Sequence, residues 1–506
     1  MGSEMCIRDS SNSYNCSPEW NRFGYQCHIR CSIRLGKALE ELKKQTAELT
    51  TLERFAYSTF NGADYLIKNI IGKYMFFFYT TTLAVNPLWL AIFQPALKIL
   101  DVITDPLVGE WSDRTKSRMG KRRPWILIGS ITLGIVFPLS WMPNIVMFWD
   151  PAPTVLSIFI YFMIFKFLYY ITHTAAVVPY YALGAELSTD YQERTKIVAW
   201  RHMVGAPMTV LATVPFLLAT QPELFPDEET GIAVVMGGVG FIIIATGIWA
   251  ALGTKERAQS EPKKELPLKE ALKITLSNRP FMFLVATVFF YGIGQYFSVA
   301  FGVYLINFII FDGDKSQTTE LLFWATAGGA LVAMALNLLI RRLGKKYEKV
   351  VLFKLGMLLS LSVPLACLVA FQPHEPTWYY LLHVLALPIG NTIIEVLPLS
   401  IVADICDLDE TKSGRRREGA FVGVYNSAFK SGYMIAPALA MVLLHFTGFD
   451  GNLVQQSQQT QDLMQLFMVL GTFFTFFAAI VCSYFITLSR ADIDNARRRI
   501  DASTTV

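Results

Sequence analysis

Twelve apolar runs, each close to twenty residues long, dominate the sequence and limit what the chain can fold into. A helix of roughly 20 apolar residues crosses a hydrocarbon core of about 30 Å. Of the 506 residues 53% are hydrophobic and only 17% are charged, less charge than a soluble chain of this length carries. We therefore expect an all-α membrane protein with twelve transmembrane helices, at about 57–84, 88–110, 124–143, 154–184, 197–221, 230–253, 281–310, 319–340, 350–371, 377–403, 420–446 and 463–488.

The distribution of Lys and Arg predicts how these segments are oriented. The connections after the second, fourth, eighth and tenth segments, the central linker and the tail are all basic, whereas the six opposite connections contain Lys315 alone. Basic connections stay in the cytoplasm. Both termini are therefore expected there, in a multi-pass protein of the plasma (inner) membrane. The net charge of +4 gives no support to nucleic-acid binding.

A charged stretch in the middle of the chain separates six segments from six. A weak repeat supports this division, because GEWSDRTKSRMGKRRPW after the second segment matches RRLGKKYEKV after the eighth, and PYYALGAELSTDYQERT matches LPLSIVADICDLDETKSGRRR. Two similar halves around a midplane site are common in secondary carriers. We expect a cytoplasmic segment, a six-helix bundle, a linker, a second bundle and a cytoplasmic tail, with boundaries 1–56, 57–253, 254–280, 281–489 and 490–506.

The first residues are unlike the rest of the chain. The opening string MGSEMCIRDS resembles a translated sequencing-adaptor fragment, and four of the seven cysteines lie within the first 31 residues. A small metal site there would involve Cys16, Cys27, His28 and Cys31, but their spacing matches no standard zinc pattern. We interpret residues 1–35 as an assembly artefact or a wrongly chosen start.

The loop after the second segment, DPLVGEWSDRTKSRMGKRRPW, combines acids, glycines and bases in a fixed order. Its glycines permit a tight turn and close helix approach, and Asp113 can pair with the basic cluster. The loop resembles the signature loop of the major facilitator superfamily, in the form seen in its glycoside-pentoside-hexuronide:cation symporter branch. The resemblance implies two pseudo-symmetric six-helix bundles and a gating loop containing Gly109, Asp113, Arg114, Gly120, Arg122 and Arg123.

Two acids in the second segment indicate a cation site. Asp101 and Asp105 are four residues apart, so they lie on one helix face, where uncompensated carboxylates at membrane depth cost about 2.5–3.5 kcal/mol each on insertion scales. Lys98 and Lys430 are candidate counterions, and a bound Na⁺ or a shared proton would serve equally. A static buried ion network is the alternative.

The resemblance to melibiose-carrier-like proteins extends to single residues. It implies Asp101, Thr104, Asp105 and Thr174 as oxygen ligands of the coupling cation and Lys98 and Lys430 as charge-pairing residues. It also implies a substrate site that includes an acid, a stacking aromatic ring and an arginine, namely Asp64, Tyr181 and Arg201, with Lys430. The family's helix-four acid is replaced by Val177, and His173, one turn away, is either a substitute polar contact or a packed polar side chain. Glu395 in the tenth segment is a further candidate polar contact from the second half.

We therefore expect a secondary active transporter that couples Na⁺ or H⁺ to the symport of a sugar or glycoside by alternating access. Its partners are a small-molecule solute and the lipid bilayer, it acts as a monomer, and it needs no cofactor or metal besides the coupling ion. A lysolipid or other amphiphile symporter is the nearest alternative. A membrane enzyme would need a nucleophile and base or a metal cluster, and a sensor would need an added signalling domain. No nucleotide-binding G-x-x-x-x-G-K-[ST] loop is present.

Overall fold

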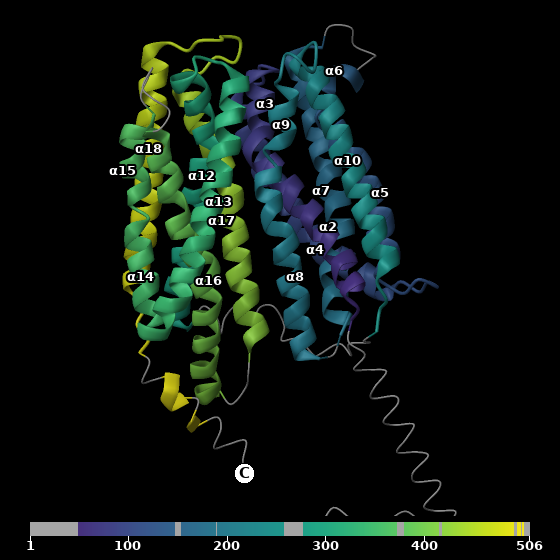
Figure 1. Ribbon diagram of the computed structural model, residues 1–506, viewed down its shortest axis with the longest axis vertical. Coiled ribbons are helices and arrows are strands. Elements are labelled where there is room, and N and C mark those ends of the chain that lie inside the picture. The colour runs from purple at the N-terminus through teal and green to yellow at the C-terminus, as the bar shows by residue number, and fades with distance from the viewer. Residues whose placement is uncertain are drawn as a thin grey trace, which may run out of the picture.

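The computed structural model describes residues 49–146, 153–188, 190–257, 277–371, 379–413, 417–489, 493–496 and 498–499. Long helices run side by side along one direction through this part of the chain (Figure 1). The first half contains α2 (Thr51–Ile70), η2 (Ile71–Met75), α3 (Phe76–Thr81), α4 (Pro87–Arg114), α5 (Arg123–Leu139), α6 (Pro143–Val146), α7 (Val155–Glu186), α8 (Tyr191–Leu211), α9 (Val214–Ala219) and α10 (Glu228–Gly253). The second half contains α12 (Arg279–Leu305), η3 (Ile306–Ile310), α13 (Lys315–Lys346), α14 (Lys349–Leu359), α15 (Ser362–Ala370), α16 (Tyr380–Ser413), α17 (Glu418–Phe446) and α18 (Gln458–Tyr484).

Short polar residues start these helices. Asn86, Asp190 and Asp314 accept hydrogen bonds from free backbone N–H groups in the first turns of α4, α8 and α13. Asp227 does the same for α10, and the backbone hydrogen bond from Thr230 lowers the pKa of this exposed carboxyl. These caps explain where several of the twelve apolar runs begin, and each run coincides with helical structure.

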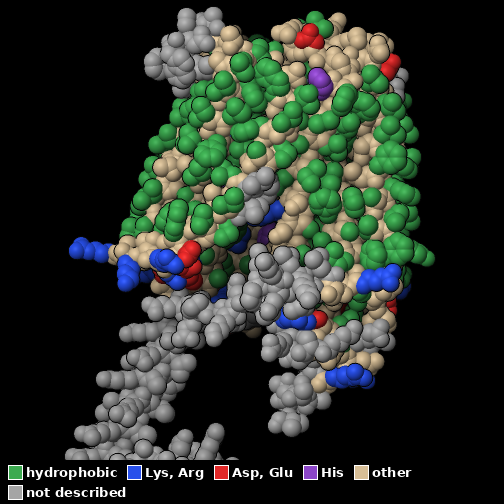
Figure 2. Space-filling view, turned by 180° about the vertical axis from the view of Figure 1, so that it is seen from behind, with side chains coloured by type: hydrophobic (Ala, Val, Ile, Leu, Met, Phe, Trp, Pro, Cys, Tyr) green, Lys and Arg blue, Asp and Glu red, His purple; other side chains and the backbone are tan. Residues whose placement is uncertain are grey.

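Nine of the described helices are long and apolar enough to cross a membrane. Three expected spans are not among them. The first consists of α2, η2 and α3, the second is α4, and the third is α5. Helix α5 has 17 residues, whereas α2 carries Asp64 and Lys68 within its apolar face. Many large apolar side chains are exposed on these helices, and they cover much of the face that Figure 2 shows. The protein is a multi-pass membrane protein, and the count of twelve spans stays a prediction.

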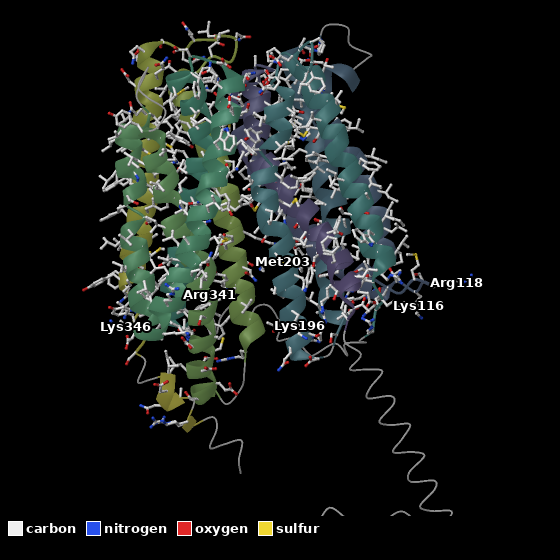
Figure 3. All side chains as sticks on the ribbon, viewed as in Figure 1. Lys116, Arg118, Lys196, Met203, Arg341 and Lys346 are labelled. Atoms are coloured by element: carbon white, nitrogen blue, oxygen red, sulfur yellow. The ribbon has the colours of Figure 1, made fainter. Side chains whose placement is uncertain are left out.

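The two ends of the helices differ in charge. Lys116, Arg118, Lys196, Arg341 and Lys346 gather at one end (Figure 3), which we call the basic end. The opposite end carries Asp227, Glu228, Asp312, Asp314 and Asp450, and we call it the acidic end. The basic end corresponds to the face that the sequence places in the cytoplasm.

Helices of the first half pack mainly against one another, and so do those of the second half. In the first half α5 lies between α7 and α10, and α2 packs on α8 and α10; in the second half α12 packs on both α17 and α18. The halves meet where α4 packs on α17, η2 on α12, and α9 on α13. The two groups of helices are close at the acidic end and diverge toward the basic end (Figure 1).

Polar contacts close the acidic end between the halves. The Lys315 Nζ lies 2.7 Å from Glu228 Oε2, and the hydroxyls of Thr80 and Tyr304 are 2.7 Å apart. Thr220 and Thr319 share a hydrogen bond of 2.9 Å. The ion pairs of Arg54 with Glu193 and of Lys349 with Asp404, toward the basic end, each join elements of one half. Polar contacts therefore join the halves at the acidic end, and the two groups of helices diverge toward the basic end (Figure 1).

Candidate functional site

A buried carboxylate on α2 organises a cluster of polar side chains between the helices of the first half. The Asp64 side chain is 1% exposed, and it accepts hydrogen bonds from three side chains. Lys68 Nζ lies 2.6 Å from Oδ2, Tyr181 OH donates to Oδ2 at 2.9 Å, and His173 Nε2 lies 2.9 Å from Oδ1. We call Asp64, Lys68, His173 and Tyr181 the Asp64 cluster.

Helix geometry explains how these side chains meet. Lys68 follows Asp64 by four residues, so both emerge on the same face of α2. His173 and Tyr181 stand about two turns apart on α7 and reach the two oxygens of the carboxylate from different levels. Because the carboxylate is buried while Lys68 is 39% and His173 15% exposed, a solute would first meet the groups around Asp64.

Arg201 extends the cluster toward α8. Its guanidinium lies 4.5 Å from the centre of the Tyr181 ring, and its Nε donates to Asn61 Oδ1 at 3.1 Å. This cation–π contact attracts the guanidinium to the face of the ring and helps to hold the two side chains together. Four of the predicted substrate residues, Asp64, His173, Tyr181 and Arg201, are thus brought together by α2, α7 and α8.

Residues of the second half face this cluster. Tyr433 OH donates to the backbone oxygen of Lys68 at 3.4 Å, and its ring meets that of Tyr296 edge-on at 4.4 Å. Glu395 of α16 is exposed and receives a hydrogen bond of 3.4 Å from Asn391. Among the described residues, Glu395 makes no hydrogen bond or ion pair with the Asp64 cluster.

The candidate cation site lies nearby on α4. Thr174 Oγ1 donates to Asp105 Oδ1 at 3.2 Å, and Lys430 Nζ of the second half lies 3.8 Å from Oδ2. Asp105 is 34% and Lys430 64% exposed, so this ion pair is long and open to water. Thr104 is half-buried one position before Asp105, whereas the side chains of Lys98 and Asp101 lie outside the described residues.

The predicted gating loop is a network within the first half. Arg122 donates to Asp113 and Ser112, to Gly109 O at 3.3 Å, and to Glu186 Oε1 at 3.4 Å. Arg114 pairs with Glu110 on the same helix, and Arg123 donates to backbone oxygens at the end of α10. The loop thereby ties the ends of α4, α7 and α10 together.

Gly120 shows why this loop needs its glycine. Its φ is +103°, and a Cβ there would overlap the carboxylate of Glu256. That carboxylate accepts the backbone N–H groups of Lys121 at 2.9 Å and Arg122 at 2.8 Å, at the start of α5. An anion at a helix N-terminus is favourable. The loop is therefore held by the start of the linker as well as by its own charges.

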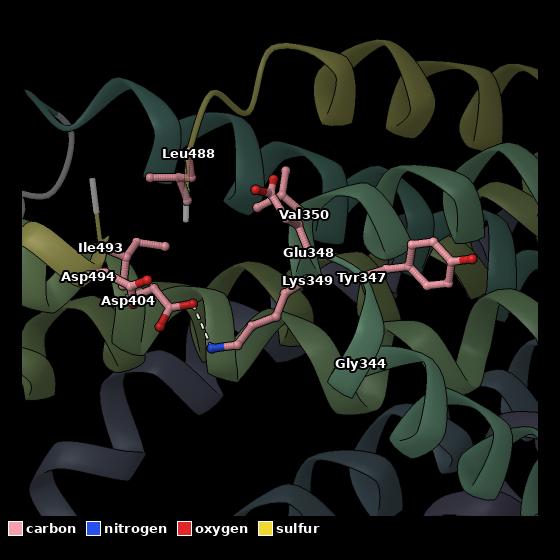
Figure 4. Close-up of a pocket in the computed structure, with 9 residues that line it drawn as sticks. All are labelled: Gly344, Tyr347, Glu348, Lys349, Val350, Asp404, Leu488, Ile493 and Asp494. Atoms are coloured by element: carbon pink, nitrogen blue, oxygen red, sulfur yellow. Dashed lines mark hydrogen bonds and ion pairs between the residues drawn. The ribbon is translucent and has the colours of Figure 1, made fainter. Parts of the chain in front are cut away.

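The second half repeats part of this arrangement. Lys349, at the start of α14, lies 2.7 Å from Asp404 of α16, as Lys121 lies 3.0 Å from Glu186 of α7. Figure 4 shows this pair in a pocket of about 180 Å³ that is also lined by Leu488. Other ion pairs at the basic end, such as Arg54 with Glu193 and Arg417 with Asp409, likewise stay within one half. Each of these four pairs therefore joins elements of a single half.

Sequence reasoning missed Lys68, Asn61 and Tyr433. The spacing of Asp64 and Lys68 was a usable signal, because an acid followed four residues later by a base on an apolar helix predicts a pair. Tyr433 carried no such signal. Its role depends on how α17 packs against α2, which no local pattern reveals.

Comparisons with known proteins agree on one family. A family model described as MFS/sugar transport protein matches residues 61–490. The chain is 24% identical to an uncharacterised symporter of Synechocystis, covering 81% of this chain and 88% of that protein. It is 24% identical to a putative glycoside/cation symporter of Escherichia coli, covering 89% and 94%. A sodium-dependent lysophosphatidylcholine symporter of Mus musculus is 22% identical, covering 88% and 86%.

A solved structure shares the fold. A bacterial homologue of the human lysosomal transporter Spinster superposes with a TM-score of 0.64, covering 87% of this chain and all of that one, at 14% identity.

Proposed function

Because the chain belongs to the MFS/sugar transport family, which confirms the resemblance of its signature loop, we propose that it couples Na⁺ or H⁺ to the uptake of a sugar or glycoside. Cation-coupled symport of sugars and glycosides is the activity that the names of its relatives support for the family. The observation that carries the proposal is the pair of neighbouring polar sites, the Asp64 cluster and the Asp105 site, in the half-open space between the halves.

The Asp105 site suggests how the cation and the solute are coupled. The ammonium group of Lys430 partly neutralises Asp105 from 3.8 Å away. A cation held by Asp105, Thr174, Thr104 and Asp101 takes over that role and releases Lys430. The freed ammonium group can then donate hydrogen bonds to solute hydroxyls. Cation binding would thus strengthen solute binding, as coupling between two sites requires.

Uptake by the purified protein in liposomes tests the proposal. We expect labelled sugar or glycoside to accumulate against its concentration only when a Na⁺ or H⁺ gradient is imposed, and imposing each gradient separately identifies the ion. Absence of gradient-dependent accumulation for every sugar and glycoside in a broad panel would contradict the proposal.

Transport also requires the closed acidic end to open. We propose that the basic end faces the cytoplasm and that the Lys315–Glu228 pair, with Thr80 and Tyr304, closes the outer side. Rocking of one half against the other then alternates access to the sites.

Replacing Glu228 with Gln is expected to shift the protein toward the outward-open state, because it removes the ion pair that joins the halves at the acidic end. A cysteine placed at the buried Thr319, in a chain whose other cysteines are replaced, reports the change. We expect a membrane-impermeant maleimide to label it several-fold faster from outside. The charge-swapped variant Glu228→Lys with Lys315→Glu serves as the control and should restore slow labelling; equal rates in all three proteins would refute this role.

One observation favours transport of an amphiphile instead. Val177 replaces the acid that the symporter branch uses for sugar hydroxyls, and the mouse relative is named as a lysophosphatidylcholine symporter. A thermal-shift screen with sugars, glycosides and lysolipids, each with and without Na⁺, distinguishes sugar or glycoside transport from amphiphile transport. Stabilisation by lysolipid alone would favour the second function.

A further inference from the structure

The second half carries a row of aromatic rings where α18 ends. Helix α18 packs on both α12 and α14, and α14 and α18 lie at one edge of the molecule (Figure 1). The ring of Phe283 in α12 stacks on that of Phe485, the residue after α18, with 5.1 Å between the ring centres. The Phe485 ring in turn lies 6.1 Å from that of Tyr484, the last residue of α18. We call Phe283, Phe485 and Tyr484 the aromatic strip.

A cation stands at each end of the aromatic strip. The guanidinium of Arg279, at the start of α12, lies 5.9 Å from the centre of the Phe283 ring. At the other end, Lys354 Nζ of α14 lies 5.5 Å from the centre of the Tyr484 ring. Among the described residues, no carboxylate lies within ion-pair distance of either cation. Both therefore keep a positive charge that no described protein group neutralises.

Position and exposure suit the aromatic strip to the headgroup level of a bilayer. Helix α14 begins soon after Lys346, which Figure 3 labels at the basic end. Tyr484 is 74% and Phe485 46% exposed, whereas Phe283 packs partly against the core. Exposed tyrosines are typical of the interface between membrane and water, because the ring is apolar and the hydroxyl is polar.

An exposed apolar face continues from the aromatic strip along α18. Four exposed residues of this helix follow one another at intervals of three or four positions, so they share one helix face. They are Phe474, Phe477, Val481 and Tyr484. The face extends over roughly 15 Å of the helix. Beside it, α14 has a similar exposed face formed by Val351, Leu355 and Leu358. A soluble anion would leave both faces uncovered, whereas the acyl chains of a lipid cover them.

We propose that Arg279, Lys354 and the aromatic strip form a binding site for one phospholipid with a net negative charge. The two cations attract the headgroup phosphate, and the acyl chains lie along the exposed face of α18. A zwitterionic lipid binds less well, because its ammonium group brings a further positive charge to the two cations. None of these three helices contributes a side chain to the Asp64 cluster or to the ion pair of Asp105, so this lipid is not the transported solute. All three belong to one half, and the lipid can therefore stay bound while the halves rock.

Binding of lipid to the delipidated full-length protein in detergent tests the proposal. Native mass spectrometry counts the molecules of dioleoyl phosphatidylglycerol or dioleoyl phosphatidylcholine on each protein, and these two lipids share their acyl chains. The first phosphatidylglycerol should bind about tenfold to thirtyfold more tightly than the first phosphatidylcholine, as two cations near an anionic headgroup predict. Glycerol phosphate offers the same anionic group without acyl chains and should not displace the lipid. Displacement by glycerol phosphate at an equal concentration would assign the site to a soluble anion and overturn the proposal.

Variants assign the preference to this site. Arg279→Met with Lys354→Met should reduce the preference for phosphatidylglycerol to about twofold or less, because both cations are lost. Arg279→Lys with Lys354→Arg keeps both charges and should keep the preference, and Tyr484→Ala should weaken the binding of both lipids. Lys116→Met with Arg118→Met is the control, since it removes two exposed cations from the basic end of the other half. An equal loss in the control would mean that lipid binding follows the overall charge of the basic end. That result, or an unchanged preference in the first variant, would overturn the proposal and leave symport standing.

Discussion

Replacing Asp105 with Asn should abolish gradient-driven uptake while the protein still folds and inserts. The carboxylate is the only charged oxygen ligand that the structure describes at the candidate cation site, where Thr174 donates to it at 3.2 Å and Lys430 stands 3.8 Å away. The amide has nearly the same shape but cannot neutralise a cation. We expect accumulation in liposomes to fall to the level of equilibration, because solute can exchange but is no longer coupled to the ion.

The neighbouring carboxylate of Glu110 provides a matched control. It lies on the same helix, is exposed, and pairs with Arg114 at the basic end. Glu110→Gln should therefore keep concentrative uptake. If Asp105→Asn also keeps it, Asp105 has no part in coupling and the ion pair with Lys430 is a static contact.

Replacing Asp64 with Asn should weaken solute binding by about tenfold to a hundredfold, the range expected when hydrogen bonds to a charged group are lost. The carboxylate holds Lys68, His173 and Tyr181 in place from a position that is 1% exposed. Without its charge Lys68 loses its counterion and the donors lose their common acceptor. Titration of solute into purified protein measures the change.

A double variant separates binding from folding. Breaking a buried ion pair from one side can destabilise a protein by about 3–5 kcal/mol, whereas removing both charges costs less. Asp64→Asn with Lys68→Met should therefore recover thermal stability but not solute affinity. Recovery of affinity together with stability would mean that Asp64 serves the fold alone.

The helices could be predicted from the sequence because membrane spans depend on a local property, the length of an apolar run. Each expected segment coincides with a helix, and caps such as Asn86 and Asp227 explain where several begin. Spans that contain charged residues are harder to predict from hydropathy. In α2, Asp64 and Lys68 neutralise each other, so the helix can lie in a membrane although its mean hydropathy is lowered by these two charged residues.

The site was only partly predictable, since contacts between helices depend on packing. The resemblance to symporters indicated Asp105, Thr174 and Lys430, and the structure brings these three together; their role in cation binding stays a prediction. It could not indicate that Glu256 anchors the gating loop, because that contact joins residues more than a hundred positions apart. The sequence predicts a gating loop in which Asp113 pairs with the basic cluster, and the described contacts of that loop stay within its own half.

The polar seal at the acidic end has an energetic consequence for the speed of the cycle. Hydrogen bonds contribute about 0.5–1.5 kcal/mol each and exposed ion pairs about 0–1 kcal/mol. The contacts of Thr80 with Tyr304, Thr220 with Thr319, Gln221 with Ser316 and Lys315 with Glu228 thus total roughly 2–6 kcal/mol. Thermal fluctuations can break a seal of that strength many times a second. The free-energy cost of switching between the two access states is then small enough for the binding of one ion and one solute to determine the direction of transport.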